Sequence, residues 1–463
     1  MRLRAYIGDR AFYRRLFAVM VPILIQQLIT NFVSLLDNVM VGQVGTEPMS
    51  GVAIVNQLLF VYNLCIFGGL AGAGIFTAQF YGKGDWKGLQ DTVRTKLWFA
   101  LLAVGVCLSV FLLFGEKLIS LFLHQGEEDL DLEATLGYAK EYLAVMLIQT
   151  APFALTQVYS STLRETCATV LPMRAGIAAV LVNLVFNYIL IFGKLGIPAL
   201  GVVGAAIATV LSRFVELTII LVWTHRHREK NPFVVGLYRS LRVPGKLLRQ
   251  ILVLGSPLLL NELLWSGGMT VLNQCYSMRG LEVVSAMNIY TTISNLFFSA
   301  FISTGNATAI MVGQLLGAGE LERAVDEDRK LIAFAFALSI VLSAMMAATA
   351  PFFPLIYNTI PYVRELATKI LLISSLMMPL HAFANSCYFT LRSGGKTFIT
   401  FIFDSGSLWL ISVPMAFVIA HYSLIAIIPF FTIVEGLNLI KCVIGYVMVK
   451  QRHWVVNLVE GKA

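Results

Sequence analysis

The chain has 463 residues, of which 58% are hydrophobic and only 13% are charged, and its mean hydropathy is +0.79. A soluble protein would carry about a quarter charged residues, so the composition excludes an ordinary soluble domain and predicts a polytopic membrane protein. The net charge of +8 does not indicate nucleic-acid binding, because the basic residues lie in short loops beside apolar segments, as in positive-inside topology.

Twelve segments are long and apolar enough to cross a bilayer, whose core of about 30 Å requires roughly 20 apolar residues per helix. The run that follows the basic N-terminal stretch is too long for a signal peptide, and no small-residue cleavage site follows it. We therefore predict an all-α integral membrane fold with twelve transmembrane helices near residues 16–41, 50–80, 96–123, 133–163, 170–193, 201–224, 248–278, 284–315, 330–355, 362–391, 397–419 and 423–449.

Basic residues are concentrated in alternate loops. Lys83 and Lys87 follow the second segment, and the most basic connection is residues 225–250, after the sixth. The loops between them carry few cations, as in HQGEEDLDLEA at 124–134. Because cytoplasmic loops are rich in Lys and Arg, both termini of this multi-pass protein of the inner (plasma) membrane are expected to be cytoplasmic. The arginines before the first segment are Arg2, Arg4, Arg10, Arg14 and Arg15.

The second half of the chain repeats the first. PILIQQ at 22–27 aligns with PLLLNE at 257–262, and AQFYGKGD at 78–85 aligns with GQLLGAGE at 313–320, both at an offset of 235 residues. Both halves start on the same side, so the repeats are parallel, as in two-lobed transporters. We predict two pseudo-symmetric six-helix bundles, an N-terminal lobe at 1–224 and a C-terminal lobe at 248–463, joined by a cytoplasmic linker at 225–247.

One carboxylate stands out in the N-terminal lobe. Asp37 is the only charged residue between Arg15 and Gly42, although burying such a group in a membrane costs at least a few kcal/mol. Asn183 and Asn187 are four residues apart on one helix face, and Thr209 follows on the next segment at a similar depth. Their oxygens suit Na⁺ or a protonatable acid. The alternatives are an Asp37 that snorkels or pairs with a lysine, and asparagines that join helices.

The C-terminal lobe offers a second set of ionisable residues. Glu262 and Glu435 are expected near mid-membrane, with His381 and Asp404 closer to the cytoplasmic side. Glu262 is the preferred functional candidate, and the others are equally consistent with structural polar contacts. Two further charged residues of the N-terminal lobe, three apart and predicted to pair, are Arg213 and Glu216.

Other chemistries find little support in the sequence. The six cysteines are scattered without a CxxC pair and are read as buried hydrophobes. RSGGKT at 392–397 resembles the end of a phosphate-binding loop but lacks its first glycine and its strand. No cofactor is expected apart from the coupling ion, and no nucleophile–His–acid grouping suggests an enzyme.

At this point the residues resemble a known family. LLDNVMVG at 35–42, TAQFYGKGD at 77–85 and the long stretch at 182–210, together with GSPLLLNELLW at 255–265 and YFTLRSGGKT at 388–397, are similar to the multidrug and toxic compound extrusion (MATE) family. The resemblance covers nearly the whole chain. It implies two lobes, alternating access, and efflux of organic cations or amphiphilic compounds in exchange for Na⁺ or H⁺.

The resemblance also implies roles for single residues. Asp37 matches the family's acid of the first helix, Asn183 its amide, and Thr209 its hydroxyl. Asn187 falls where the archaeal-type branch has a second aspartate, and His381 falls where the sodium-coupled bacterial branch has an aspartate. Glu262 lies about one turn before the family's usual glutamate. The first departure weakens a complete archaeal-type cation site in the N-terminal lobe and leaves Asp37 as its only acid. The second is more serious, because a neutral His cannot balance Na⁺ as a carboxylate would. Coupling is therefore expected in the N-terminal lobe.

The expected mechanism is exchange at Asp37, which would hold either the coupling ion or a cationic substrate. Residues considered for the substrate cleft are Gln27, Gln157, Trp265, Tyr276 and Asn385. The expected partners are small organic cations or amphiphiles and membrane lipid, and one chain suffices for function because it supplies both lobes. The alternatives are a lipid-linked precursor flippase of the wider superfamily, an intramembrane enzyme and a channel.

Overall fold

The computed structural model describes residues 6–123, 131–357 and 359–460, and within these ranges it contains helices and no strand. The described residues include twelve candidate spans, each long and apolar enough to cross a membrane, so the predicted fold class and span number are confirmed. Arg2, Arg4 and the first part of the acidic loop at 124–134, on which the orientation also depends, lie outside the described residues.

The first half supplies six spans. Their helices are α1 (Arg10–Gly42), α2 (Thr46–Lys83), α3 (Trp86–Ser120), α4 (Leu132–Met146), α5 (Thr150–Glu165), α6 (Val170–Phe192) and α7 (Gly201–Arg226). A short 3₁₀ turn, η2 (Leu147–Gln149), joins α4 to α5 within one span. Pro152 follows this turn and has no N–H to donate back to residue 148, so the regular helical ladder is interrupted there.

The second half begins after a linker containing the short turns η3 (Pro232–Val234) and η4 (Leu237–Arg239). Its helices are α8 (Gly245–Ser277), α9 (Leu281–Gly317), α10 (Leu321–Thr349), α11 (Pro361–Ser393), α12 (Thr397–Phe401), α13 (Val413–Tyr422), α14 (Ile427–Gly436) and α15 (Asn438–Lys450), with a turn η5 (Phe353–Ile356) after α10. The π-helical segments η6 (Ile402–Gly406) and η7 (Leu408–Ser412) precede Pro414, which cannot donate the N–H that a regular α-helical turn would use.

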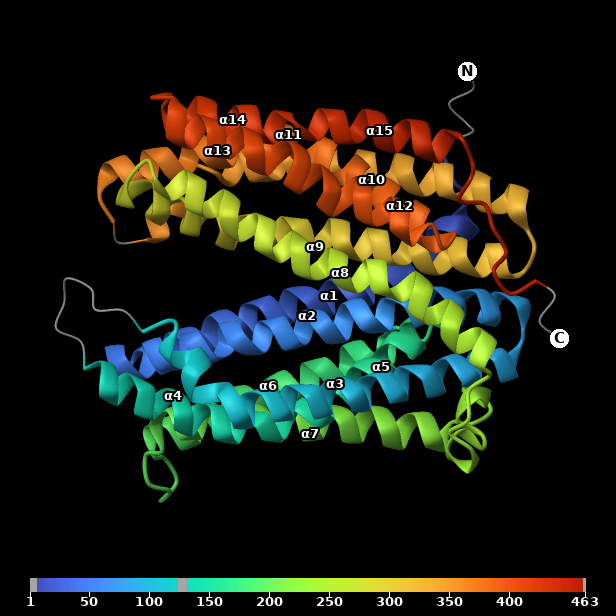
Figure 1. Ribbon diagram of the computed structural model, residues 1–463, viewed down its shortest axis with the longest axis horizontal. Coiled ribbons are helices and arrows are strands. Elements are labelled where there is room, and N and C mark those ends of the chain that lie inside the picture. The colour runs from blue at the N-terminus through green and yellow to red at the C-terminus, as the bar shows by residue number, and fades with distance from the viewer. Residues whose placement is uncertain (1–5, 124–130, 358, 461–463) are drawn as a thin grey trace. The chain divides into compact units, whose positions relative to one another are not determined.

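The chain forms two compact units (Figure 1), which we name by the half that dominates each. The N-unit comprises Ile25–Thr77 and Trp86–Ile251, and the C-unit comprises Met1–Leu24, Ala78–Asp85 and Leu252–Ala463. α6 and α7 pack side by side in the N-unit, as do α9, α10 and α11 in the C-unit. The units thus divide the chain differently from the lobes expected at 1–224 and 248–463. The first part of α1 belongs to the C-unit because its Leu16 lies in one apolar cluster with Leu315 and Leu331.

Two glycines of the C-unit reproduce the sequence repeat in three dimensions. A Cβ placed on Gly82 of α2 would lie 1.9 Å from the backbone carbonyl oxygen of Gln314, and a Cβ on Gly317 of α9 would lie 1.9 Å from that of Gln79. The two contacts are related by the same offset of 235 residues, since 82 + 235 = 317 and 79 + 235 = 314. The ends of α2 and α9 therefore cross backbone to backbone, which only glycine permits.

Gly317→Ala is expected to destabilise the protein by about 1–3 kcal/mol, because the added methyl group meets a backbone carbonyl and the helices must separate. The melting temperature of the purified protein in detergent tests this. Gly105→Ala is the matched control, since a Cβ there has no neighbouring atom within 4 Å in the middle of α3. Equal melting temperatures for Gly317→Ala and wild type would contradict the close crossing.

The segment after α15 packs against this crossing. Trp454 is buried, and the side-chain amide of Gln79 donates to the carbonyl oxygens of Ser393 and Val456, each at 3.2 Å. Its oxygen accepts from the backbone N–H of Leu458 at 2.7 Å. Gln79 therefore fastens the C-terminal segment to the end of α2, a role that its position in the repeat did not reveal.

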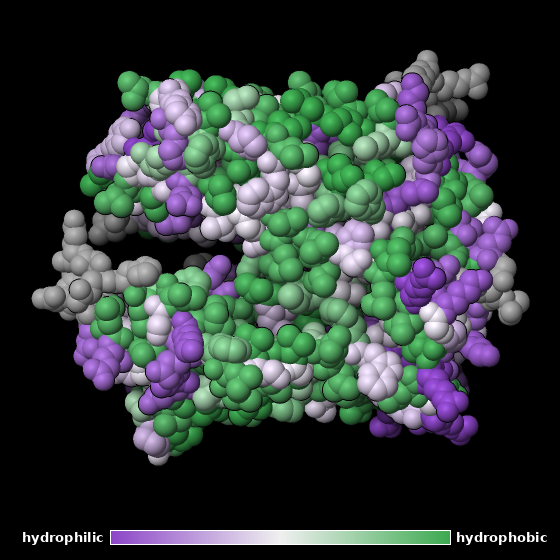
Figure 2. Space-filling model, in the orientation of Figure 1, coloured by the Kyte–Doolittle hydropathy of each residue, from purple (hydrophilic) through white to green (hydrophobic). Residues whose placement is uncertain are grey.

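Apolar side chains cover the sides of the helices, and hydrophilic ones gather at the helix ends (Figure 2). Leu112 and Leu113 of α3, for example, are 74% and 73% exposed. Such extensive exposed apolar surface is unfavourable in water and favourable against lipid chains. The surface therefore agrees with the twelve spans.

Candidate functional site

Four residues proposed from the sequence form one hydrogen-bonded chain in the N-unit. The side-chain amide of Asn187 on α6 donates to Asp37 Oδ1 on α1 at 2.6 Å and to Asn183 Oδ1, one turn earlier, at 3.2 Å. Asn183 Nδ2 in turn donates to Thr209 Oγ1 on α7 at 3.3 Å. The i, i+4 spacing of the asparagines places both on one face of α6. Three helices thus hold the carboxylate through a line of polar groups.

The two asparagines of this hydrogen-bonded chain are buried, and one of their oxygens has an unused acceptor. Asn183 and Asn187 are 4% and 1% exposed. Asn187 Oδ1 is buried and has no hydrogen-bond partner among the described atoms. A buried acceptor without a partner is costly, so Asn187 Oδ1 is able to accept one further hydrogen bond. The chain offers one carboxylate charge, which matches a monovalent ion or a proton.

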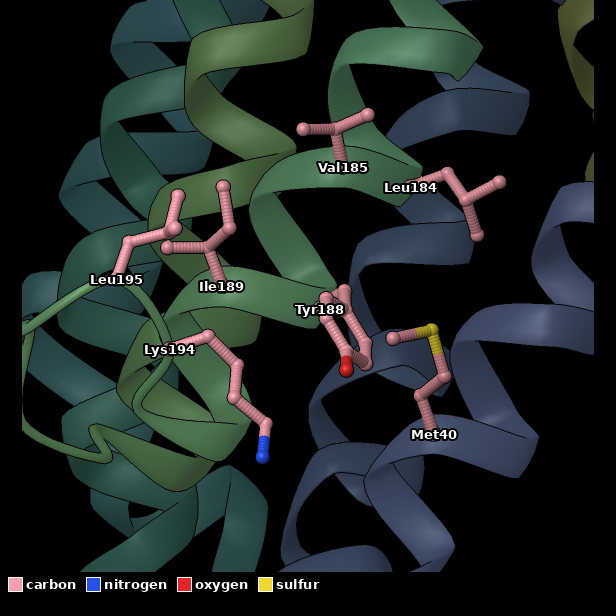
Figure 3. A pocket seen from close by; sticks show the side chains of 7 residues that line it. All are labelled: Met40, Leu184, Val185, Tyr188, Ile189, Lys194 and Leu195. Atoms are coloured by element: carbon pink, nitrogen blue, oxygen red, sulfur yellow. The ribbon is translucent and has the colours of Figure 1, made fainter.

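An apolar pocket of about 810 Å³ in the N-unit is lined by residues of α1, of α6 and of the segment that follows α6 (Figure 3). Met40 comes one turn after Asp37, and Leu184 and Tyr188 directly follow the two asparagines. The Met40 side chain and the Tyr188 ring point toward one another. The volume is in the range of small-molecule sites. The complete lining is Met40, Leu184, Val185, Tyr188, Ile189, Lys194 and Leu195.

Farther along α7 lies an ion pair. Arg213 Nη1 is 3.0 Å from Glu216 Oε2, which confirms that these residues satisfy each other. The Arg213 guanidinium also lies 5.4 Å from the centroid of the Phe153 ring. Glu216 is 3% exposed, so its charge is held almost entirely by protein groups.

In the C-unit, two candidates from distant parts of the sequence meet. His381 Nε2 on α11 is 2.6 Å from Glu435 Oε2 on α14. The edge of the His381 ring faces the ring of Phe298, with their centroids 5.3 Å apart. The sequence suggested both residues separately, and the structure joins them. The pair brings a carboxylate and an imidazole ring into direct contact.

The remaining acids of the C-unit are placed differently. Asp404, in the π-helical segment η6, pairs with Lys441 of α15 through Oδ1 and accepts from Asn261 Nδ2 at 3.1 Å through Oδ2. The side chain of Glu262, which follows Asn261 on α8, makes no hydrogen bond or ion pair with the described residues. Lys441 was missed by the sequence reasoning, although a lysine six residues after Glu435 within an apolar span was the available signal.

Comparison with known proteins adds a decisive observation. The model of the MatE family matches residues 22–189 and 257–418, more than half of the chain. The chain belongs to the MatE family. The two matched stretches start 257 − 22 = 235 residues apart, which is the offset of the internal repeat. As a MatE-family member with twelve candidate spans, the protein is a multi-pass membrane transporter rather than an enzyme.

Relatives and solved structures agree with this assignment. The chain is 27% identical over 416 residues to a probable multidrug resistance protein NorM of Thermotoga maritima, covering 88% of this chain and 86% of that protein. It is 24% identical over 418 residues to a probable multidrug resistance protein YoeA of Bacillus subtilis, covering 90% and 89%. An outward-facing multidrug resistance MATE family transporter has the same fold, with a TM-score of 0.86, 20% identity and 97% of each chain covered.

The five residues considered for a substrate cleft lie in different surroundings in this MatE protein. Gln27 and Gln157 are half-buried in the N-unit. In the C-unit, Trp265 is 42% exposed, whereas Tyr276 is 3% exposed. The centroids of the Tyr276 and Phe430 rings are 5.1 Å apart, and Tyr276 belongs to the apolar core. Asn385 is half-buried and packs against Gly305 of α9.

The two departures from the MatE pattern acquire a structural meaning. Asn187, at which the resemblance implied a departure from an aspartate, donates an N–H to Asp37. His381, the other departure that the resemblance implied, contacts Glu435. Among the described residues, no group of three or more His, Cys, Asp and Glu side chains could hold a metal ion.

Proposed function

We propose that this MatE-family protein is a secondary active multidrug efflux antiporter of the inner membrane. It exports organic cations or amphiphilic compounds in exchange for Na⁺ or H⁺ by alternating access, with both termini in the cytoplasm. The names of its relatives, which are multidrug resistance proteins, support the substrate class. The coupling ion is assigned to the N-unit.

The hydrogen-bonded chain Asp37–Asn187–Asn183–Thr209 is the observation that carries the proposal. An ionisable residue kept at a cost inside a membrane span marks an ion or substrate pathway. Asp37 is such a residue. It accepts a hydrogen bond from the neutral amide of Asn187, and it forms no ion pair with the described residues. Its negative charge therefore remains available to a mobile ligand.

Substrate and coupling ion are exchanged because both bind to the single negative charge of Asp37. The anionic Asp37 attracts a cationic substrate, whose apolar part fits the pocket beside Met40 and Tyr188. A proton or Na⁺ at Asp37 removes that attraction and favours release of the substrate. A ligand shifts such an equilibrium only by its differential affinity for the two states, and here the difference is one full charge.

Proteoliposomes containing the purified protein and loaded with ethidium test the proposal. An imposed pH gradient and an imposed Na⁺ gradient, applied separately, are expected to give export with at least one of the two. Protein-free liposomes and liposomes with both gradients collapsed are the controls. Folded protein that moves ethidium equally fast with and without each gradient would contradict antiport.

A further inference from the structure

A second polar layer lies on the same helices as the Asp37 chain. On α7, Thr209, Arg213 and Glu216 are spaced i, i+4 and i+7, so they share one face of the helix. At a rise of 1.5 Å per residue, Glu216 lies about 10 Å from Thr209 along the axis, toward the proposed cytoplasmic end. It is 3% exposed and pairs with Arg213 at 3.0 Å.

Helices α6 and α1 complete this second layer. Gly176, seven residues before Asn183 on α6, leaves space in which a Cβ would lie 4.0 Å from Glu216 Oε1 and 3.6 Å from the Gln26 side chain. Gln26 precedes Asp37 on α1 by 37 − 26 = 11 residues, about three helical turns. The three helices therefore bring polar groups together twice, once around Asp37 and once around Glu216.

Arg213 lies between the two layers, and one of its hydrogen-bond donors is unused. Its Nε is buried and has no hydrogen-bond partner among the described atoms, although a guanidinium has five donors. Its charge acts on Asp37 as well as on Glu216. The side chain is 31% exposed, so it is not locked by packing on every side. One cation therefore serves two carboxylates on the same side of α7.

The charged groups that face the two acids come from several helices. Glu216 is faced by Arg213 from its own helix and, at longer range, by Arg164 from α5. α6 contributes the uncharged Gly176 and α1 the uncharged Gln26. Asp37 is faced by Asn187 from α6 and Arg213 from α7, and its charge is felt by Tyr142 of α4. Arg213 is the cation common to both sets.

We propose that Glu216 receives the coupling proton from Asp37 and passes it to the cytoplasmic side, while Arg213 changes its partner. This rests on the proposed antiport and assigns H⁺ as the coupling ion, because Glu216 is a second buried acid on the same helices and can carry a proton. The proton leaves the Asp37 carboxyl, crosses the roughly 10 Å between the two layers on water molecules, and binds a Glu216 oxygen. Arg213 leaves the neutral Glu216 and pairs with the anionic Asp37 until a cationic substrate displaces it. The three side chains together are neutral before and after the step, so no net charge is created in the membrane.

The test uses the same proteoliposomes, with export measured against the pH on the cytoplasmic side. Glu216→Gln is expected to slow proton-driven export by roughly tenfold or more and to flatten its dependence on that pH, with ethidium affinity unchanged. Glu216→Asp retains the acid and is expected to restore the pH dependence. Glu216→Gln leaves Arg213 without its partner carboxylate. The double variant Arg213→Gln/Glu216→Gln removes both charges and is expected to lose proton-driven export and its pH dependence to the same extent.

Glu116→Gln is the matched control, since this α3 acid in the N-unit is exposed and pairs only at the surface with Lys140. Wild-type export rates and pH profiles in Glu216→Gln would overturn the relay, as would export by the wild type that Na⁺ alone drives. The second result would leave antiport intact. Export by the wild type that neither gradient drives would instead contradict the proposed function itself.

Discussion

Asp37→Asn is expected to reduce gradient-driven ethidium export to the rate of protein-free liposomes. The substitution preserves the shape of the side chain and its acceptor for Asn187, which lies 2.6 Å away, but it removes the charge that both the ion and the substrate require. Asp37 forms no ion pair with the described residues, so removing its charge from the membrane span is not expected to destabilise the fold. The variant is therefore expected to be expressed and to melt at or above the wild-type temperature.

Two controls separate the role of the charge from that of the shape. Asp37→Glu keeps a carboxylate and is expected to retain part of the export, because the longer side chain disturbs the Asn187 contact without removing the charge. Glu116→Gln removes an exposed acid of the same unit and is expected to export at the wild-type rate. Normal export by Asp37→Asn would remove Asp37 from the coupling mechanism.

Lys441→Met is expected to produce the largest loss of stability among single changes in the C-unit. Lys441 and Asp404 each have side chains 18% exposed, and their pairing neutralises two charges inside the helix bundle. Removing the lysine leaves Asp404 with Asn261 alone, and an unpaired buried charge costs about 3 kcal/mol. The melting temperature in detergent is expected to fall by several degrees.

The double variant Lys441→Met/Asp404→Asn is expected to recover most of that loss, because it removes both charges and keeps the shapes. Lys369→Met serves as the control, since Lys369 pairs with Glu365 at the surface, where ion pairs contribute little. A single variant as stable as the wild type would show that Asp404 does not depend on Lys441. A double variant no more stable than the single one would assign the loss to packing around the lysine.

The membrane fold could be predicted from the sequence because it depends on local composition. Twelve apolar segments gave twelve spans, but several helices extend past the predicted limits. α2, for example, continues to Lys83 rather than to residue 80, since polar residues at a helix end do not stop the helix. The division into compact units could not be read from the repeat, because the packing of Leu16 with Leu331 joins residues more than 300 apart.

The N-unit site was largely predictable for a physical reason. Asn183 and Asn187 lie one turn apart on one helix, and Thr209 is on the next, so spacing and depth alone suggested their meeting. The C-unit pairs were not predictable in this way. His381 meets Glu435 and Asp404 meets Lys441 only through the packing of helices separated in sequence, and one residue per helix leaves no periodic signal.

The most direct measurement is the affinity of the purified protein for ethidium as pH and Na⁺ concentration are varied separately. If one carboxylate serves both ligands, the affinity falls as the coupling ion is added, with about one ion displaced per bound cation, and the ion loses affinity reciprocally. Asp37→Asn is expected to abolish this dependence. An affinity that stays constant across both titrations in the wild type would contradict exchange at Asp37.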